Sequence, residues 1–276
     1  MKAYVCDLET NGLLHELDRV HSLVLRDMAT GEVISCTNET SLVNNYHPIA
    51  HGLDLLAKAD VVIGHNFINF DARAIAKVYP SFEAKSDSAI HDTLIISRVL
   101  SPEMEMVDDQ KYAHIPPKYR GKHSLAAWGE RLGVEKIKFT ENEKKSKGAD
   151  INVWDKWSEE MQVYCEQDTL VTKVLYEYFQ TQKLDSRCFE LEHEFAVIAT
   201  MIEQHGFHFN ERAAFGLVNV LKTKRSEIHD QLQEVFPPIV QERTSDKTGK
   251  RLKDKVILFN PGSRQQTARR LRERYP

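Results

Sequence analysis

Residues 3–14, AYVCDLETNGLL, decide the fold and raise the first question about function. Apolar and polar positions alternate, which is typical of a β-strand, and Asp7 and Glu9 stand two positions apart. Side chains two residues apart on a strand project from one face. Because two carboxylates on one face repel each other, either this is an edge strand with solvated acids or a cation lies between them. Carboxylate oxygens suit Mg²⁺ or Mn²⁺.

The segments that follow predict an α/β fold. β-rich runs predict strands in HSLVLRDM (21–28) and VISC (33–36), which with the first strand indicate an antiparallel start. A short helix in LDLLAKAD (53–60) leads into VVIGHN (61–66), an apolar run typical of a buried strand. Helical spacing predicts further helices in FDARAIAKVY, DTLIISRVL, HSLAAWGERLG and residues 158–182.

Proline, glycine and serine mark the ends of these helices. Pro80 and Pro102 close the helices that precede them, and Gly133 is a usual helix stop. Ser158 is a suitable N-cap for the long helix. The polar segments between helices are expected to be loops, and they comprise residues 101–122 and the surface segment FTENEKKSKGAD, 139–150.

A second unit is expected to begin near Ser186. Two amphipathic helices follow, separated by Gly206 and ended by Pro237 and Pro238. Residues 243–276 carry 11 Lys/Arg against 3 Asp/Glu, a balance of +8, which leaves −12 on the rest of a chain whose net charge is −4. Such a basic tail, with a short basic helix in NPGSRQQTARRLRERY, indicates either contact with a polyanion or a solvated, partly disordered end.

The bulk composition excludes several classes of protein. The chain has 276 residues, enough for one large domain or two small ones. No apolar run is long enough to span a bilayer, and acids come too early for a signal peptide, so we expect a cytoplasmic protein without a membrane partner. The cysteines show no close pairing, which argues against a zinc or disulfide framework and favours a reduced setting: Cys6, Cys36, Cys165 and Cys188.

Two further groups of acids attract attention. Asp71 follows a buried strand and begins a helix, where an acid is often only a favourable partner of the helix dipole. Tyr164 and Asp168 are four residues apart on a predicted helix and share one face, a pair that chance also produces. No single motif is decisive, but their order and spacing are informative together.

In that order, the acids and Tyr164-x-x-x-Asp168 resemble the DEDD superfamily of 3′–5′ exonucleases, in the subclass whose last motif contains tyrosine (DEDDy). GHNFINFD, HDTLIISRVL and GKHSLAAWGERLG are similar to segments of family A DNA polymerases of the bacteriophage T-seven type. The resemblance implies a ribonuclease H-like mixed sheet flanked by helices in residues 1–185, and a mainly helical, partial thumb-like segment in 186–276. Because palm and fingers sequences are missing before Pro276, polymerisation by this chain alone is not expected.

The resemblance also implies roles for individual residues. Two divalent metal ions, Mg²⁺ or Mn²⁺, would be held by Asp7, Glu9, Asp71 and Asp168. Tyr164 would orient the attacking water, because a tyrosine is a poor general base near neutral pH. The positions expected to contact the terminal nucleotides are Thr10, Leu13, Asn66 and Phe70, although Leu13 and Phe70 are equally suited to a core. His65 and Asp92 are interpreted as structural.

The sequence therefore predicts an enzyme that removes nucleotides from single-stranded or frayed 3′ ends of DNA, either as a proofreading subunit beside a separate polymerase chain or as a truncated portion of one. Two alternatives stay open. The same acids could hydrolyse RNA 3′ ends, although a helical RNA-binding domain is missing. A module that docks on DNA or on a polymerase without catalysis is the alternative of another class.

Overall fold

The computed structural model describes residues 1–84, 89–134, 137, 139, 152–183, 185–244 and 249–275. The chain forms two compact units, Met1–Gly206 and Phe207–Pro276. The first unit includes the helix Ser186–His205 (α8), which the sequence assigned to the thumb-like segment. Within the described residues, none of the helices is both long enough and apolar enough to cross a membrane.

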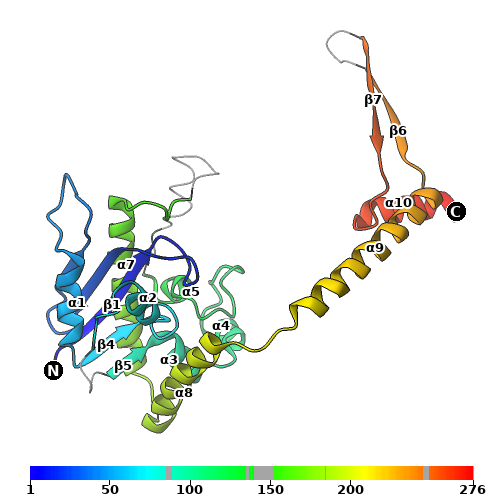
Figure 1. Ribbon diagram of the computed structural model, residues 1–276. Coiled ribbons are helices and arrows are strands. Elements are labelled where there is room, and N and C mark those ends of the chain that lie inside the picture. Colours follow the sequence, from blue (N-terminus) through cyan, green and yellow to red (C-terminus); the bar gives the residue numbers. More distant parts are fainter. Residues whose placement is uncertain are drawn as a thin grey trace. The chain divides into compact units, whose positions relative to one another are not determined.

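A five-stranded mixed sheet forms the centre of the first unit in the part of the chain that the structure describes (Figure 1). The strand order is β3-β2-β1-β4-β5; the first three strands pair antiparallel, and β4 and β5 continue parallel to β1. This is the expected ribonuclease H-like arrangement of an antiparallel start joined to a parallel half. The strands are Ala3–Thr10 (β1), Val20–Asp27 (β2), Val33–Cys36 (β3), Val61–Gly64 (β4) and Ala89–Asp92 (β5).

The two faces of the sheet are covered by different helices. On one face, Cys6 and Leu8 of β1 enter a core with residues of α1 (Ile49–Ala57) and α2 (Asp71–Val78). On the other face, α7 (Glu159–Gln180) packs across β1, β2 and β4. Arg26 of β2 fixes α7 there, since its guanidinium donates to the Thr169 hydroxyl at 3.2 Å and to the Glu166 carbonyl at 3.1 Å.

Helices α3 (Thr93–Leu100) and α5 (Leu125–Leu132) pack against α7 around Trp128, which is buried. The predicted helix signals are confirmed at three ends. Ser158 accepts a hydrogen bond from the Met161 N–H at 3.2 Å, Gly133 ends α5 with φ of 66°, and α3 ends just before Pro102. The Ser158 cap sets where α7 begins.

The expectation of a loop over residues 101–122 is wrong in part, because Met104–Lys111 form a helix, α4. Its sequence is mostly polar, but Asp108 is buried and forms an ion pair with Arg131 of α5 at 2.7 Å. A partner 23 residues away along the chain stabilises this helix, and local spacing does not reveal it. The expected surface segment 139–150 lies outside the described residues except for Phe139, which is buried.

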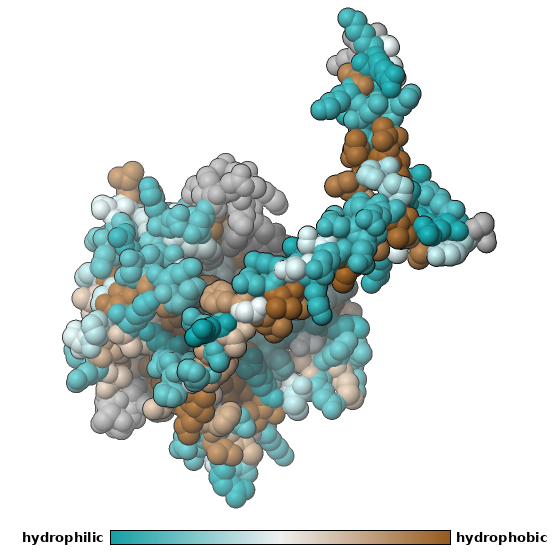
Figure 2. Space-filling view, turned by 45° about the vertical axis from the view of Figure 1, so that its right-hand side comes forward, coloured by the Kyte–Doolittle hydropathy of each residue, from teal (hydrophilic) through white to brown (hydrophobic). Residues whose placement is uncertain are grey.

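The second unit consists of α9 (Glu211–Val235), a hairpin of β6 (Ile239–Thr244) and β7 (Arg251–Ile257), and α10 (Arg264–Arg274). The sequence did not predict this hairpin. Phe259 is the buried centre of the unit: its ring lies 4.7 Å from that of Phe236, and its backbone exchanges two hydrogen bonds with the Gln233 side chain. In Figure 2 this unit shows brown apolar patches beside the hydrophilic surface of its hairpin.

Candidate functional site

The register of the sheet decides which way the two acids of β1 point. Asp7 lies opposite Val24 of β2, and Glu9 lies opposite Ser22. Arg26 is opposite Val5, two positions earlier on β1, and it contacts α7. Because alternate residues share a face, Asp7 and Glu9 project toward α7, as the sequence predicted for a shared face.

α7 brings three side chains to these acids. The Cys165 thiol donates to the Oδ2 and the backbone carbonyl of Asp7, at 3.4 Å each. The ligand atoms of Asp7, Glu9 and Cys165 all lie within 4.8 Å of one another. Tyr164 and Asp168 lie one residue before and three residues after Cys165 on the same helix, and Asp168 is buried. One turn of α7 therefore faces the acidic end of β1.

Asp71 reaches the same end of the sheet from α2, of which it is the first residue. β4, which precedes it, runs parallel to β1, so the two strands end at the same edge. Asp71 is buried, and burial followed by repulsion from Asp7 raises the pKa of its carboxyl well above the usual value. A backbone N–H of Leu8 bonds to it and opposes that shift. The charge of Asp7 on β1 thus acts on Asp71 of α2.

Tyr164 is held by an aromatic cluster beside the acids. Its ring lies 5.6 Å from that of Phe139 and 6.4 Å from that of Trp154. Burial is the main reason that the pKa of its hydroxyl is raised, and the charges of three acids raise it further: Asp168, Glu9 and Asp7. The hydroxyl therefore keeps its proton at neutral pH and hydrogen-bonds with Asp168.

The four positions expected to contact a terminal nucleotide differ in how far their side chains are exposed. Leu13 is 63% exposed, so its alternative interpretation as a core residue is wrong. Phe70 directly precedes Asp71, is half-buried and packs against the core, which leaves both of its interpretations open. Thr10 is buried, and its hydroxyl donates to the Gly12 carbonyl at 2.8 Å.

Asn66, the fourth of these positions, has a φ of 66°, the only positive φ of a non-glycine residue in the described ranges. Asparagine tolerates this left-handed conformation better than most residues do. The turn is tight: a Cβ on Gly64 would come within 2.7 Å of the Phe67 Cβ. The segment between β4 and α2 is therefore fixed in one shape, and Asp71 follows at its end.

The donor set suits a hard divalent cation. Asp7, Glu9, Asp71 and Asp168 offer carboxylate oxygens, which Mg²⁺ and Mn²⁺ prefer. The raised pKa of Asp71 reflects burial and repulsion among carboxylates, which a bound cation would relieve. Burial raises the pKa of the Cys165 thiol, and the charges of Asp7, Glu9 and Asp168 raise it further, so Cys165 serves as a thiol donor to Asp7.

Sequence reasoning missed Cys165 as a contributor to this region. Cys165 contacts Asp7 although 158 residues separate them, and the available signal was its position three residues before Asp168, on the same helix face. The interpretation of Asp92 as structural agrees with the structure, since its carboxylate accepts hydrogen bonds from the backbone of Asn66 at 2.9 Å and of Ile68 at 3.1 Å. That carboxylate fixes the turn that leads to Asp71.

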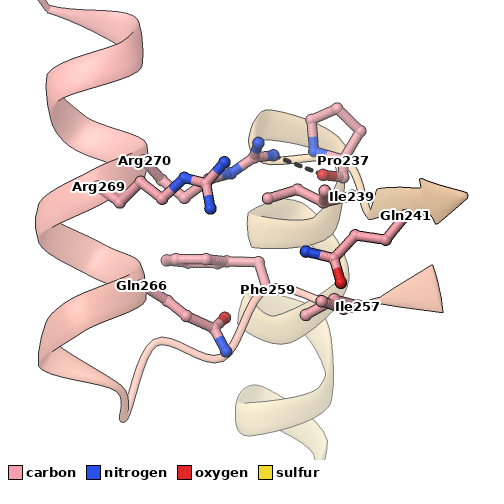
Figure 3. Close-up of a pocket in the computed structure, with 8 residues that line it drawn as sticks. All are labelled: Pro237, Ile239, Gln241, Ile257, Phe259, Gln266, Arg269 and Arg270. Carbon is pink, nitrogen blue, oxygen red and sulfur yellow. Dashed lines mark hydrogen bonds between the residues drawn. The ribbon is translucent and has the colours of Figure 1, made fainter. Parts of the chain in front are cut away.

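A cavity in the second unit offers different chemistry (Figure 3). Phe259, Ile239 and Ile257 form apolar walls, and the side chains of Arg269 and Arg270 lie across it. Arg270 donates to the Pro237 carbonyl. Its lining contains no carboxylate, thiol or imidazole, so among the described residues the acids of the first unit are better suited to hydrolytic chemistry.

Comparisons with known proteins point to DNA polymerases of phages. No protein-family model matches the chain. The chain is 28% identical over 272 residues to the DNA-directed DNA polymerase of Escherichia phage T7. The match covers 84% of this chain and 37% of that polymerase. The chain is 27% identical to the DNA-directed DNA polymerase of Enterobacteria phage T3, over 272 residues and with the same coverage of the two chains.

The chain thus spans 37% of the length of these two relatives. A solved structure described as the apo form of the nuclease matches with a TM-score of 0.48 and 16% identity, over 74% of this chain and 85% of that one. In sequence, the chain is therefore similar to part of two phage DNA polymerases.

Proposed function

We propose that this chain is a metal-dependent 3′–5′ exonuclease that removes nucleotides from the 3′ ends of DNA. The observation that carries the proposal is the convergence of acids from three elements, Asp7 and Glu9 of β1, Asp71 of α2 and Asp168 of α7, with the Tyr164 hydroxyl beside them. The similarity to two phage DNA polymerases supports DNA as the substrate.

In this proposal the four acids hold two divalent ions, Mg²⁺ or Mn²⁺. When bound, such ions supply a nucleophilic water at neutral pH and offset charge on the departing 3′ oxygen. The protonated Tyr164 hydroxyl orients that water, because its raised pKa makes it a poor base. Cys165 restrains the Asp7 carboxylate by donating to its Oδ2.

The end of the DNA strand is proposed to enter between two flanking segments. Leu13 is exposed and is positioned to wedge against the last base. Phe70 is half-buried beside Asp71 and is positioned to stack on a neighbouring base. Thr10 and Asn66 supply polar groups at the same edge of the sheet. A single-stranded or frayed end fits this role, since the reacting phosphate has to reach acids that are half-buried or buried.

The second unit is proposed to contact the DNA backbone. Lys253 and Lys255 alternate along β7 and are exposed, so they share one face of the hairpin. Arg269 and Arg272 add exposed positive charge from α10. All four belong to the basic tail, whose balance is +8. Binding through such groups weakens as the salt concentration rises.

A polymerase chain is proposed as a protein partner. The relatives are DNA polymerases, and α8 exposes large apolar side chains, including Phe195, Met201 and Ile202. Contiguous exposed apolar surface is a usual mark of an interaction site.

The test uses single-stranded DNA and RNA of one sequence, each labelled at the 5′ end and incubated with Mg²⁺, Mn²⁺ or a chelator. The proposal expects stepwise shortening of DNA from the 3′ end with either metal and none with the chelator. Faster shortening of the RNA would instead favour an RNA 3′-end exonuclease. Intact DNA and RNA under both metals would favour a non-catalytic docking module.

A further inference from the structure

The turn that delivers Asp71 is held in place by the carboxylate of Asp92. This carboxylate is fully buried and accepts three backbone N–H groups: Asn66 and Leu94 on Oδ1, at 2.9 Å each, and Ile68 on Oδ2, at 3.1 Å. Two of these donors lie in the turn between β4 and α2. Hydrogen bonds to a charged acceptor are stronger than neutral ones, so the shape of the turn depends on where Asp92 lies.

The neighbouring Thr93 adds to the same contact. Its hydroxyl donates to the Gly64 carbonyl at 3.0 Å and lies 2.9 Å from the His65 Nδ1. The end of β5 and the start of α3 therefore hold the turn from its first residue to Ile68. Asn66, in the left-handed region, is kept there by this set of bonds.

α8 fixes the position of Asp92 in turn. The Asp92 N–H donates to the Nε2 of His193 at 2.8 Å, across 101 residues of sequence. His193 Nδ1 lies 2.8 Å from the Phe189 carbonyl, which requires the proton on Nδ1 and leaves Nε2 as the acceptor. His193 is buried, and burial lowers its pKa, so the neutral ring that this arrangement needs is favoured.

We infer that His193 is a positioning residue for the candidate site: through Asp92 it fixes the turn 64–70 and hence the placement of Asp71. This inference rests on the proposed function for its catalytic consequence. Its structural part, the dependence of the turn on a histidine of α8, stands on the hydrogen bonds alone. It extends the site beyond residues 1–185, to which the sequence confined it.

Three variants separate positioning from general stabilisation. His193→Leu removes both ring nitrogens while keeping an apolar side chain of similar bulk. His193→Gln keeps a carbonyl that can accept from the Asp92 N–H. Thr200→Val is the matched control, because Thr200 is also buried on α8 but its hydroxyl donates to the local Val197 carbonyl, at 2.7 Å.

Three properties are measured for each variant: amide hydrogen exchange at Asn66 and Ile68, Mn²⁺ binding, and the kinetic parameters kcat and KM for hydrolysis at the DNA end. We expect His193→Leu to speed exchange at both amides and to weaken Mn²⁺ binding. It should also lower kcat by about tenfold, because one net hydrogen bond is lost. The KM for DNA should change little, because the DNA contacts are not removed. His193→Gln and Thr200→Val should resemble the wild type in all readouts.

The inference is overturned if His193→Leu leaves exchange at Asn66 and Ile68 unchanged. It is also overturned if His193→Gln is as impaired as His193→Leu, or if Thr200→Val causes the same loss. A wild-type chain that does not shorten DNA contradicts the proposed function instead, and the amide-exchange and Mn²⁺ readouts then still decide the role of His193.

Discussion

The Cys165 thiol on α7 lies 3.4 Å from the Asp7 Oδ2 on β1, so the helix and the strand meet through side chains at the candidate site. This contact places a fully buried neutral donor against one of the four acids of the candidate site. It restricts the rotamers of Asp7 without adding a positive charge. A hydrogen bond of this kind fixes the direction of the carboxylate toward the other acids.

Replacing Cys165 tests this contact. Cys165→Ala removes the donor and leaves a small void, so it should lower the free energy of unfolding by about 1 kcal/mol and slow hydrolysis several-fold. Cys165→Ser keeps a donor at the position and should retain more activity than Cys165→Ala. Urea unfolding and hydrolysis rates of the two variants provide the comparison; equal rates would contradict the orienting role.

The raised pKa of Asp71 predicts a pH dependence of stability without metal. In the unfolded chain an aspartate has a pKa of about 3.9, whereas burial and Asp7 raise it in the folded protein. Between the two values the folded state binds more protons, so the free energy of unfolding falls as pH rises through this window. The loss amounts to about 1.4 kcal/mol for each pKa unit of difference.

Urea unfolding in chelator between about pH 4 and pH 8 measures this effect. Asp71→Asn removes the titrating group, so its free energy of unfolding should decrease less as the pH rises. This variant should be more stable than the wild type near the upper end of the pH range. Asp54→Asn, at an exposed position of α1, is the control and should leave the slope unchanged. A slope that Asp71→Asn does not alter would refute the assignment to Asp71.

Divalent ions should stabilise the folded chain by binding to its acids. A ligand at about a hundred times its Kd adds about 2.7 kcal/mol to the free energy of unfolding. We therefore expect Mn²⁺ to raise the Tm of the wild type by several degrees and that of Glu9→Gln by less. Thermal unfolding with and without Mn²⁺ measures this difference, and an equal rise in both proteins would place the binding ions elsewhere.

Tyr164→Phe should impair catalysis while leaving the fold intact. The ring keeps its contacts with Phe139 and Trp154, and only the hydroxyl is lost. We expect kcat to fall by about tenfold to a hundredfold, with little change in KM. Because the wild-type hydroxyl stays protonated, the shape of the pH–rate profile should be the same in both proteins. A changed profile would indicate that Tyr164 titrates during the reaction.

The hairpin of the second unit should contribute to the salt dependence of DNA binding. Lys253→Glu and Lys255→Glu together should weaken binding and reduce the slope of log Kd against log salt by about one for each lost phosphate contact. Lys222→Glu, at an exposed position of α9, changes the charge in the same direction and serves as the control. Affinity measured at several salt concentrations distinguishes the variants, and an unchanged slope in the hairpin variant excludes this surface.

The sequence predicted those features that depend on local spacing. Asp7 and Glu9 share a face because strands have a period of two, and Ser158 and Gly133 act as caps through contacts within a few residues. These signals were sufficient for the first strands, for α7 and for the direction of the acids. The ends of the helices also followed from proline and glycine.

Long-range contacts account for most of what the sequence did not predict. α4 is stabilised by the buried pair Asp108–Arg131, and β5 is short and acquires its pairing from β4. The contact of His193 with Asp92 spans 101 residues. No periodicity along the chain encodes such partners, because they are set by tertiary packing.

Whether the acids of β1 carry out the hydrolysis is tested by comparing the wild type with Asp7→Asn on a 5′-labelled DNA strand with Mn²⁺. Asp7→Asn keeps the shape of the side chain and removes its charge, and Asp54→Asn is the matched control on the surface. We expect stepwise 3′ shortening by the wild type and the control, and a rate at least about a hundredfold lower for Asp7→Asn. Equal rates for Asp7→Asn and the wild type would contradict this expectation.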